Sequence, residues 1–163
     1  MIDRSIEVET RIAAPPDVVF AYFVDPELYR RWKGTNAELD PRPGGLYHVA
    51  MPSGELVRGE CVEVQLPTRI VFTWGFEGNP ELPPGSSTVE VTLHADGDGT
   101  IVRLRHDRLP TDASREQHAI GWRHYLDRLA IASAGGDPLA VTGARLRQLP
   151  AASRNASPAG DGS

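Results

Sequence analysis

The order of the periodic segments constrains the fold most: strand patterns fill the middle of the chain, and one long amphipathic helix pattern ends it. The helix pattern runs from about Ala113 to Ala134, with Asp112 as the expected N-cap and Gly135-Gly136-Asp137-Pro138 as a stop signal. One inward seam repeats every three or four residues: His118, Trp122, Tyr125, Leu129 and Ser133. We expect the opposite flank to face water, with Arg123 and Asp127 as an i,i+4 pair: Glu116, Arg123, His124, Asp127 and Arg128.

Alternating apolar and polar residues predict antiparallel strands before this helix. The first covers residues 6–12, and later ones cover 46–51, 55–65, 69–76, 88–94 and 100–107. The alternation loses its phase near Gly59, which indicates a bulge there. Between the first two strands, prolines open two short helices, one through Val24 and one from Asp25-Pro26 to Trp32.

These elements predict an α+β domain in which a curved antiparallel sheet of about six or seven strands wraps around the C-terminal helix. One helix cannot fill the hollow of such a sheet, so large side chains plug the space or a cavity remains. Bulky side chains, many of them with polar tips, are expected to point inward: Trp32, Tyr47, Met51, Phe72, Trp74, Trp122 and Tyr125. Polar-tipped aromatics are typical of ligand pockets, although a filled aromatic core is the alternative.

Composition narrows the class of protein. The chain has 163 residues and a net charge of −5 without a basic cluster, which argues against nucleic acid as a partner. The start of the chain is not apolar enough for a signal peptide, and no run of residues is apolar enough for a membrane span. With Cys61 as the only cysteine, no internal disulfide can form, and we expect a cytoplasmic protein. We expect one domain over residues 1–136 and an extension over 137–163 that is largely disordered after residue 150.

Several motifs together resemble a known superfamily. Residues 12–20 (IAAPPDVVF), Leu28 with Trp32, and residues 40–45 (DPRPGG) resemble the opening of the SRPBCC (START-like, helix-grip) superfamily. Residues 71–74 (VFTW), Gly99-Thr100 before residues 104–106 (LRH), and residues 118–122 (HAIGW) with 125–129 (YLDRL) resemble its activator-of-heat-shock-ATPase-like branch. The resemblance covers residues 5–135.

The resemblance implies a helix-grip fold and an architecture that binds hydrophobic ligands. The branch is named after a eukaryotic co-chaperone domain that stimulates a heat-shock ATPase, so a chaperone is an alternative partner. That co-chaperone contacts the chaperone through a second domain, for which we expect no room in this chain. The superfamily also includes polyketide cyclases, and it supplies no fixed catalytic residues to carry over.

His106 and His118 are the candidate titratable pair, since one lies on an inward strand face and the other on the inward seam of the helix. They could orient a polar ligand group or act as acid and base near neutral pH. The alternative is that each makes a hydrogen bond within the core. Gly121, inside the helix, indicates either a close approach to the sheet or space left for a ligand.

We therefore predict a protein that binds an apolar or amphipathic small molecule between the sheet and the C-terminal helix, without catalysis. The predicted ligand-binding residues are Trp32, Tyr47, Met51, Phe72, Trp74, His106, His118, Trp122 and Tyr125. No metal, cofactor or catalytic residue is expected. The alternatives are a cyclase-like or hydrolase-like enzyme that uses His106 or His118, and a co-chaperone module.

Overall fold

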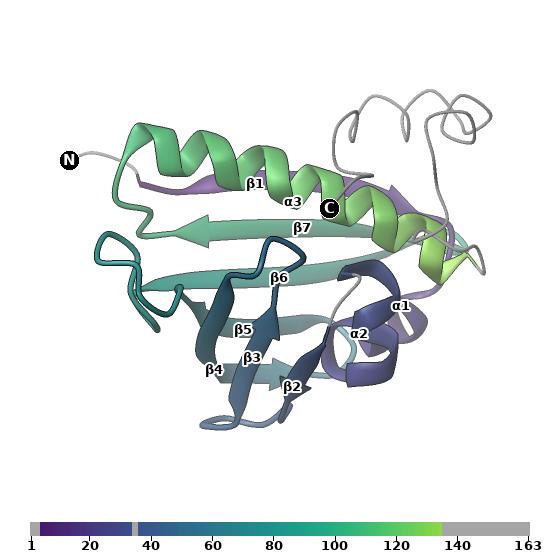
Figure 1. Ribbon diagram of the computed structural model, residues 1–163. Coiled ribbons are helices and arrows are strands. Elements are labelled where there is room, and N and C mark those ends of the chain that lie inside the picture. Colours follow the sequence, from purple (N-terminus) through teal and green to yellow (C-terminus); the bar gives the residue numbers. More distant parts are fainter. Residues whose placement is uncertain (1–3, 34–35, 135–163) are drawn as a thin grey trace.

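The computed structural model describes residues 4–33 and 36–134. The expected extension over residues 137–163, with the disorder expected after residue 150, lies outside the described residues. The fold is the predicted α+β helix-grip: a seven-stranded antiparallel sheet, two short helices after the first strand, and a long C-terminal helix (Figure 1). None of the helices in the described part of the chain is long and apolar enough to span a membrane.

The elements follow the predicted order. The strands are β1 (Ile6–Ile12), β2 (Ala37–Leu39), β3 (Leu46–Ala50), β4 (Leu56–Gln65), β5 (Arg69–Trp74), β6 (Ser87–Asp96) and β7 (Gly99–Asp107). The helices are α1 (Pro16–Val24), α2 (Pro26–Lys33) and α3 (Asp112–Ser133). The strand order in the sheet is β1-β7-β6-β5-β4-β3-β2, so the chain returns to pair its last strand with its first.

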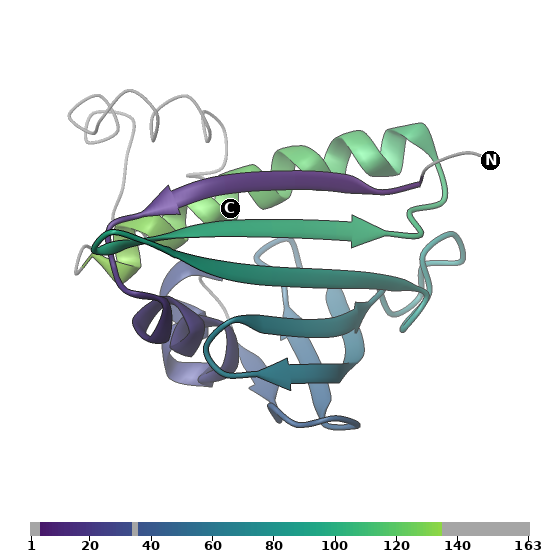
Figure 2. The ribbon, with the colours of Figure 1, turned by 180° about the vertical axis from the view of Figure 1, so that it is seen from behind.

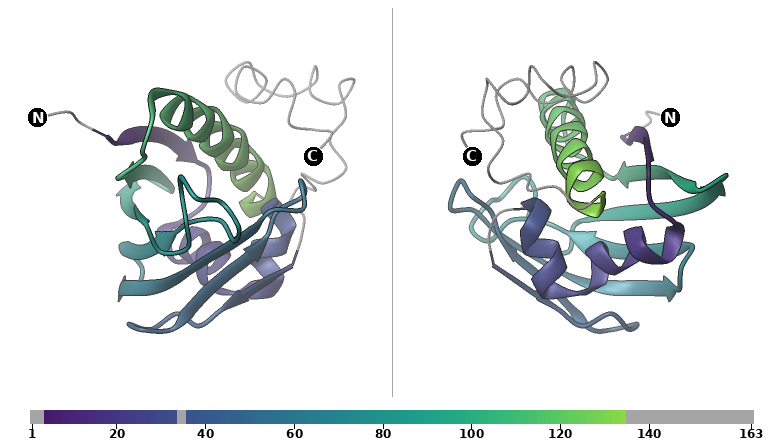
Figure 3. Two further views of the ribbon diagram at one scale, coloured as in Figure 1. Left: turned by 60° about the vertical axis from the view of Figure 1, so that its left-hand side comes forward. Right: turned by 90° about the vertical axis from the view of Figure 1, so that its right-hand side faces the viewer.

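The sheet curls, and α3 lies across its hollow. Figure 2 shows the outer side, with β1, β7 and β6 in front of α3, and Figure 3 shows the sheet bending around beneath the helix. The alternation that the sequence shows in β7 appears in the structure as alternating burial. Val102, Leu104 and His106 share one face of this strand, and all three are buried. A one-faced sheet of this kind must bury its apolar side, and α3 together with α1 and α2 covers it.

One strand detail, a bulge near Gly59, follows the prediction, and another, the short strand β2, is not predicted. The register between β4 and β5 shifts between Cys61 and Glu63, just beyond Gly59. Gly59 itself lies where β4 passes close to β5, because a Cβ built on it would lie 1.9 Å from the carbonyl oxygen of Thr73. Strand β2 pairs with β3 but has only three residues, too few to produce a detectable alternation.

The predicted wet flank of α3 is wrong in part. Glu116 and Arg123 are exposed, whereas His124, Asp127 and Arg128 are buried. The helix packs against α1 and α2 as well as β1, and Arg128 Nε donates a hydrogen bond to the carbonyl oxygen of Trp32 at 2.7 Å. Periodicity within α3 cannot show that a second set of elements covers this flank.

The helix caps follow simple hydrogen-bond rules. Asp25 caps α2 as predicted, since its carboxylate accepts a hydrogen bond from the backbone N–H of Glu27 at 2.9 Å. The N-cap of α3 is Thr111 and not the predicted Asp112; its hydroxyl accepts from the N–H of Ser114 at 3.0 Å. Both residue types are good caps, and sequence alone does not choose between neighbours.

Candidate functional site

A cavity of about 360 Å³ lies beneath the N-terminal half of α3. Its walls come from α3, from the chain after β5 and from the turn between β3 and β4, and Lys33 at the end of α2 also lines it. Lys33 is 1% exposed and marks the inner end, whereas the exposed Glu55 and Glu81 mark the rim. The volume is at the lower end of the range for small-molecule pockets, roughly 300–1,000 Å³.

The structure brings some of the predicted site residues together at this cavity. Those that line it are Met51, Trp74, His118, Trp122 and Tyr125. Those that do not line it, and are fully buried, are Trp32, Tyr47, Phe72 and His106. The hollow of the sheet is thus filled with rings in one part and open in another.

The filled part is an aromatic cluster around α2. Tyr47 stacks on Phe72 with ring centroids 3.9 Å apart, and Tyr29 meets Trp32 edge-on at 5.2 Å. Trp32 Nε1 donates a hydrogen bond to the carbonyl oxygen of Tyr22 at 2.9 Å. Close-packed rings move little, so this cluster gives the cavity a rigid base.

His106 lies in the middle of a chain of hydrogen bonds in which both of its ring nitrogens have a partner. The Ser87 hydroxyl donates to the carbonyl oxygen of Trp74 at 2.7 Å, so its oxygen accepts from His106 Nε2–H at 2.8 Å. His106 Nδ1 then accepts from Trp122 Nε1–H at 3.0 Å. Burial lowers the pKa of His106 well below its usual value, and the charges of His118 and Lys33 add to the effect. The neutral ring therefore orients Trp122, which forms part of the cavity wall.

His118 is the imidazole that reaches the cavity. Its Nδ1–H donates to the carbonyl oxygen of Ser114 at 2.8 Å, which leaves the lone pair on Nε2. Within the described part of the chain, Nε2 makes no hydrogen bond. Burial lowers the pKa of His118, although the bond to Ser114 acts in the opposite direction. At neutral pH, Nε2 is thus a hydrogen-bond acceptor for a ligand.

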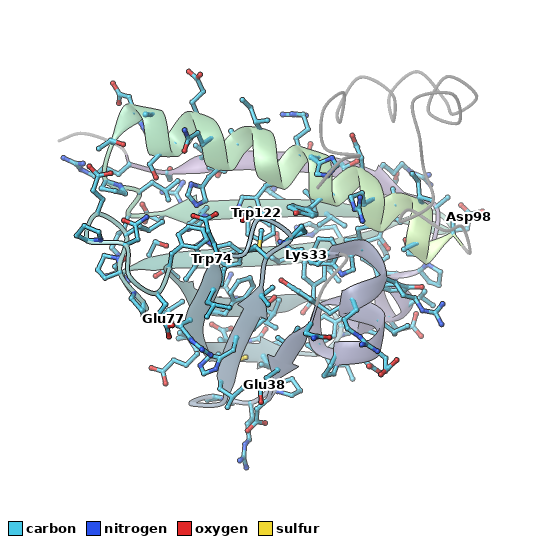
Figure 4. The ribbon with its side chains drawn as sticks, in the orientation of Figure 1. Lys33, Glu38, Trp74, Glu77, Asp98 and Trp122 are labelled. Carbon is cyan, nitrogen blue, oxygen red and sulfur yellow. The ribbon has the colours of Figure 1, made fainter. Side chains whose placement is uncertain are left out.

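Lys33 ends in a cage of five aromatic rings. Its Nζ lies 4.2 Å from the ring centroids of Trp122 and Tyr125, and Figure 4 shows Lys33, Trp74 and Trp122 together beneath α3. The rings of Trp32 and Trp74 are each 5.2 Å from Nζ, and that of Tyr29 is 5.8 Å away. Among residues 4–33 and 36–134, no side chain or carbonyl accepts a hydrogen bond from this amine. Ring faces attract a cation, but they do not replace the oxygen acceptors that it has in water.

The environment of Lys33 disfavours its charged form. Burial, and to a lesser extent the nearby charge of Arg128, lower the pKa of the amine to about 7. The phenol of Tyr29 cannot serve as the counter-ion, because burial raises its pKa and keeps it neutral. A lysine that is half deprotonated near neutral pH and faces a cavity is typical of functional sites.

Lys33 is not among the site residues that the sequence predicts. A lysine at the end of a helix usually faces water and interacts with the last carbonyl groups. Its one sequence signal is the position four residues after Tyr29, which places both side chains on one face of α2. That signal is weak, because the rings of Trp74, Trp122 and Tyr125 come from distant parts of the chain.

The described residues offer no metal centre. Over residues 4–33 and 36–134, no three His, Cys, Asp or Glu side chains are grouped so as to hold a metal ion. Cys61 is buried, and burial raises the pKa of its thiol to about 11, so it is not a reactive thiolate.

Comparison with solved structures shows the same fold in proteins from several organisms. An AHSA1-like protein from Rhizobium etli is 43% identical, with a TM-score of 0.69 over 84% of this chain and 86% of that chain. CalU16 from Micromonospora echinospora is 29% identical, with a TM-score of 0.67 over 82% of this chain and 78% of that chain. An Hsp90 activator from Plasmodium falciparum is 28% identical, with a TM-score of 0.62 over 73% of this chain and 87% of that chain.

No curated protein matches the chain. The family model described as "Activator of Hsp90 ATPase homolog 1-like protein" matches residues 13–134, which include α1, the sheet from β2 to β7, and α3. This protein belongs to the family of activator of Hsp90 ATPase homolog 1-like proteins.

Proposed function

We propose that this protein binds an amphipathic small molecule in the cavity beneath α3 and does not transform it. The observation that carries the proposal is the cavity of about 360 Å³, whose wall combines apolar and aromatic side chains with polar and charged ones. Met51, Trp74 and Trp122 provide apolar surface, while His118 Nε2 offers a hydrogen-bond acceptor. Apolar surface for the body of a ligand and well-placed polar groups that fix its orientation are both features of small-molecule sites.

A neutral fluorescent probe tests this function. We expect N-phenyl-1-naphthylamine to bind the wild type saturably, with a blue shift of its emission. Gly121 lines the cavity, and a Cβ on it meets no atom within 4 Å, so Gly121→Leu places a side chain in the open space. We expect this variant to bind the probe at least about tenfold more weakly, which corresponds to roughly 1.4 kcal/mol.

A second leucine on the same helix is the control. Arg123 is exposed, and Arg123→Leu leaves the cavity unchanged, so the probe should bind this variant as it binds the wild type. Absence of saturable binding to the wild type, or equal loss in both variants, would count against a ligand site in this cavity.

An enzymatic function that uses His118 is the second candidate. It is favoured by the lone pair of Nε2, which is free to take a proton from a bound molecule. No carboxylate among the described residues holds the ring, since Nδ1–H donates to a backbone carbonyl. Turnover of a candidate substrate that persists unchanged in His118→Gln would remove this residue from the mechanism.

A co-chaperone role is the third candidate, and the similarity to an Hsp90 activator supports it. The experiment is the ATPase rate of a purified Hsp90-type chaperone with and without this protein. A dose-dependent increase would support the role, and a flat response up to high micromolar concentration would dismiss it.

A further inference from the structure

The inner end of the cavity carries a buried lysine amine for which the described residues supply no counter-ion. Lys33 is 1% exposed, lines the cavity, and within residues 4–33 and 36–134 makes neither an ion pair nor a hydrogen bond. Three N–H donors without an acceptor are costly in a buried position. The cost is removed if a bound molecule supplies the missing acceptor.

The position of Nζ makes such a contact possible. Nζ lies 4.2 Å from the ring centroids of both Trp122 and Tyr125, and these two rings also line the cavity. The amine is thus located where the aromatic cage meets the open space. A ligand that fills the cavity against these rings would bring its inner end to Nζ.

The charges along the cavity select the ligand and its orientation. Lys33 at the inner end and Arg128 nearby make that end positive, whereas Glu55 and Glu81 make the rim negative. A cation would be repelled at the inner end, and a neutral molecule would leave the charged amine without a counter-ion. A molecule with one anionic group fits when this group enters first and the apolar body follows.

We propose that the ligand is an amphipathic monocarboxylic acid and that Lys33 Nζ binds its carboxylate at the inner end of the cavity. This inference rests on the proposed binding function and names its ligand class. A carboxylate supplies a full negative charge and lone pairs for the N–H groups of Lys33, which gives charge-assisted hydrogen bonds in a water-poor site. The five rings around Nζ enclose this ion pair in apolar surface.

Proton linkage follows from the same geometry. The pKa of Lys33 in the free protein is lowered to about 7, and a carboxylate beside the amine raises it, so the acid binds together with a proton above pH 7. The sign is therefore fixed: affinity for the acid falls as pH rises above about 7, while affinity for a neutral analogue does not. The titratable and charged groups around Lys33 are Tyr29 on α2, Tyr125, Arg128 and His118 on α3, and His106 on β7. Glu55 and Glu81 lie farther out, at the rim.

A matched pair of ligands tests the proposal. 1-Naphthaleneacetic acid and 1-naphthaleneacetamide have the same ring and length, and they differ in charge at the end that would meet Lys33. By calorimetry at pH 6.5, we expect the wild type to bind the acid at least about tenfold more tightly than the amide. Between pH 6.5 and 8.5, affinity for the acid should fall roughly twentyfold, as the amine with a pKa of about 7 loses its proton, and affinity for the amide should stay level.

A variant separates this role from the cavity itself. Lys33→Met keeps the length and apolar stem of the side chain and removes the amine. We expect this variant to lose the preference for the acid over the amide, together with the pH dependence of acid binding. The wild-type comparison of acid and amide needs no variant, so the proposal stays testable if Lys33→Met does not fold.

The outcomes distinguish the two proposals. Equal affinity of the wild type for acid and amide, or an acid preference that survives in Lys33→Met, would overturn the role of Lys33 and leave a binding cavity. Binding of neither ligand, together with failure of the neutral probe, would overturn the binding function itself.

Discussion

Two adjacent serines show how much single residues depend on their hydrogen-bond partners. Ser87 is fully buried; its hydroxyl donates to the carbonyl oxygen of Trp74 and accepts from His106. The Ser86 hydroxyl oxygen is also buried but makes no hydrogen bond in the described structure. Removing a bonded buried hydroxyl leaves its partners unsatisfied, whereas removing an unbonded one does not.

We expect Ser87→Ala to lower the free energy of unfolding by about 1–3 kcal/mol, because His106 Nε2–H loses its acceptor in a buried position. Ser86→Ala, the matched control, should change the free energy of unfolding by less than about 0.5 kcal/mol. Urea denaturation measures both values. Equal effects of the two substitutions would contradict the hydrogen-bond network around His106.

The residues of the site differ in how far sequence could identify them. Trp122 and Tyr125 follow from the helix period and Trp74 from the strand period, since the inward face of each element shows in its own pattern. His106 follows as an inward residue in the same way, but its burial behind Trp122 depends on packing. Lys33 could not be identified, because the rings around its amine come from three elements, α2, β5 and α3, that are far apart in the sequence.

At the scale of elements, two glycines have opposite roles. A Cβ on Gly121 of α3 meets no atom within 4 Å, so of the two interpretations from sequence, space beside the helix is right and close approach to the sheet is wrong. A Cβ on Gly59 of β4 would overlap the carbonyl oxygen of Thr73 at 1.9 Å. Spacing alone cannot distinguish such cases, since both glycines interrupt a regular pattern.

Gly121→Ala should raise the free energy of unfolding by about 0.5–1 kcal/mol, because alanine is the better helix former and finds room. Gly59→Ala should lower it by roughly 1–3 kcal/mol, because β4 and β5 must move apart. Thermal and urea unfolding of both variants give the comparison. A destabilised Gly121→Ala would show that the space next to this helix is closed.

At the scale of the whole molecule, α3 divides into two halves. The buried residues of this helix all lie from Trp122 onward, where it packs against α1 and α2. The half from Asp112 to Gly121 lies over the cavity and has no fully buried residue. The C-terminal half is also joined to α1 by a hydrogen bond of 3.0 Å from the Tyr22 hydroxyl to the carbonyl oxygen of Ala132.

We expect amide hydrogen exchange to be faster in residues 112–121 than in residues 122–132, because local opening there exposes little buried surface. Addition of 1-naphthaleneacetic acid should slow exchange in residues 112–121 and around Phe76 and Leu82, which also line the cavity. Mass spectrometry of the exchanged peptides measures both. Uniform protection along α3, or slowing elsewhere only, would contradict this division.

Local sequence determined the element order and the face of each element that is buried. Periods of two and of three to four residues place apolar side chains on one side of a strand or helix, and Pro, Asp and Gly mark where elements begin and end. From these, the curved sheet, the two short helices, the C-terminal helix and most of its inward seam could be predicted. Each of these properties depends on residues that are neighbours in the chain.

Only the tertiary structure decided where the hollow of the sheet stays open, that Lys33 ends inside an aromatic cage, and that the flank of α3 with Arg128 is buried. All three result from contacts between segments far apart in the sequence. Packing depends on the shapes of all the side chains that meet at a point, and the pKa of a buried amine depends on every group around it.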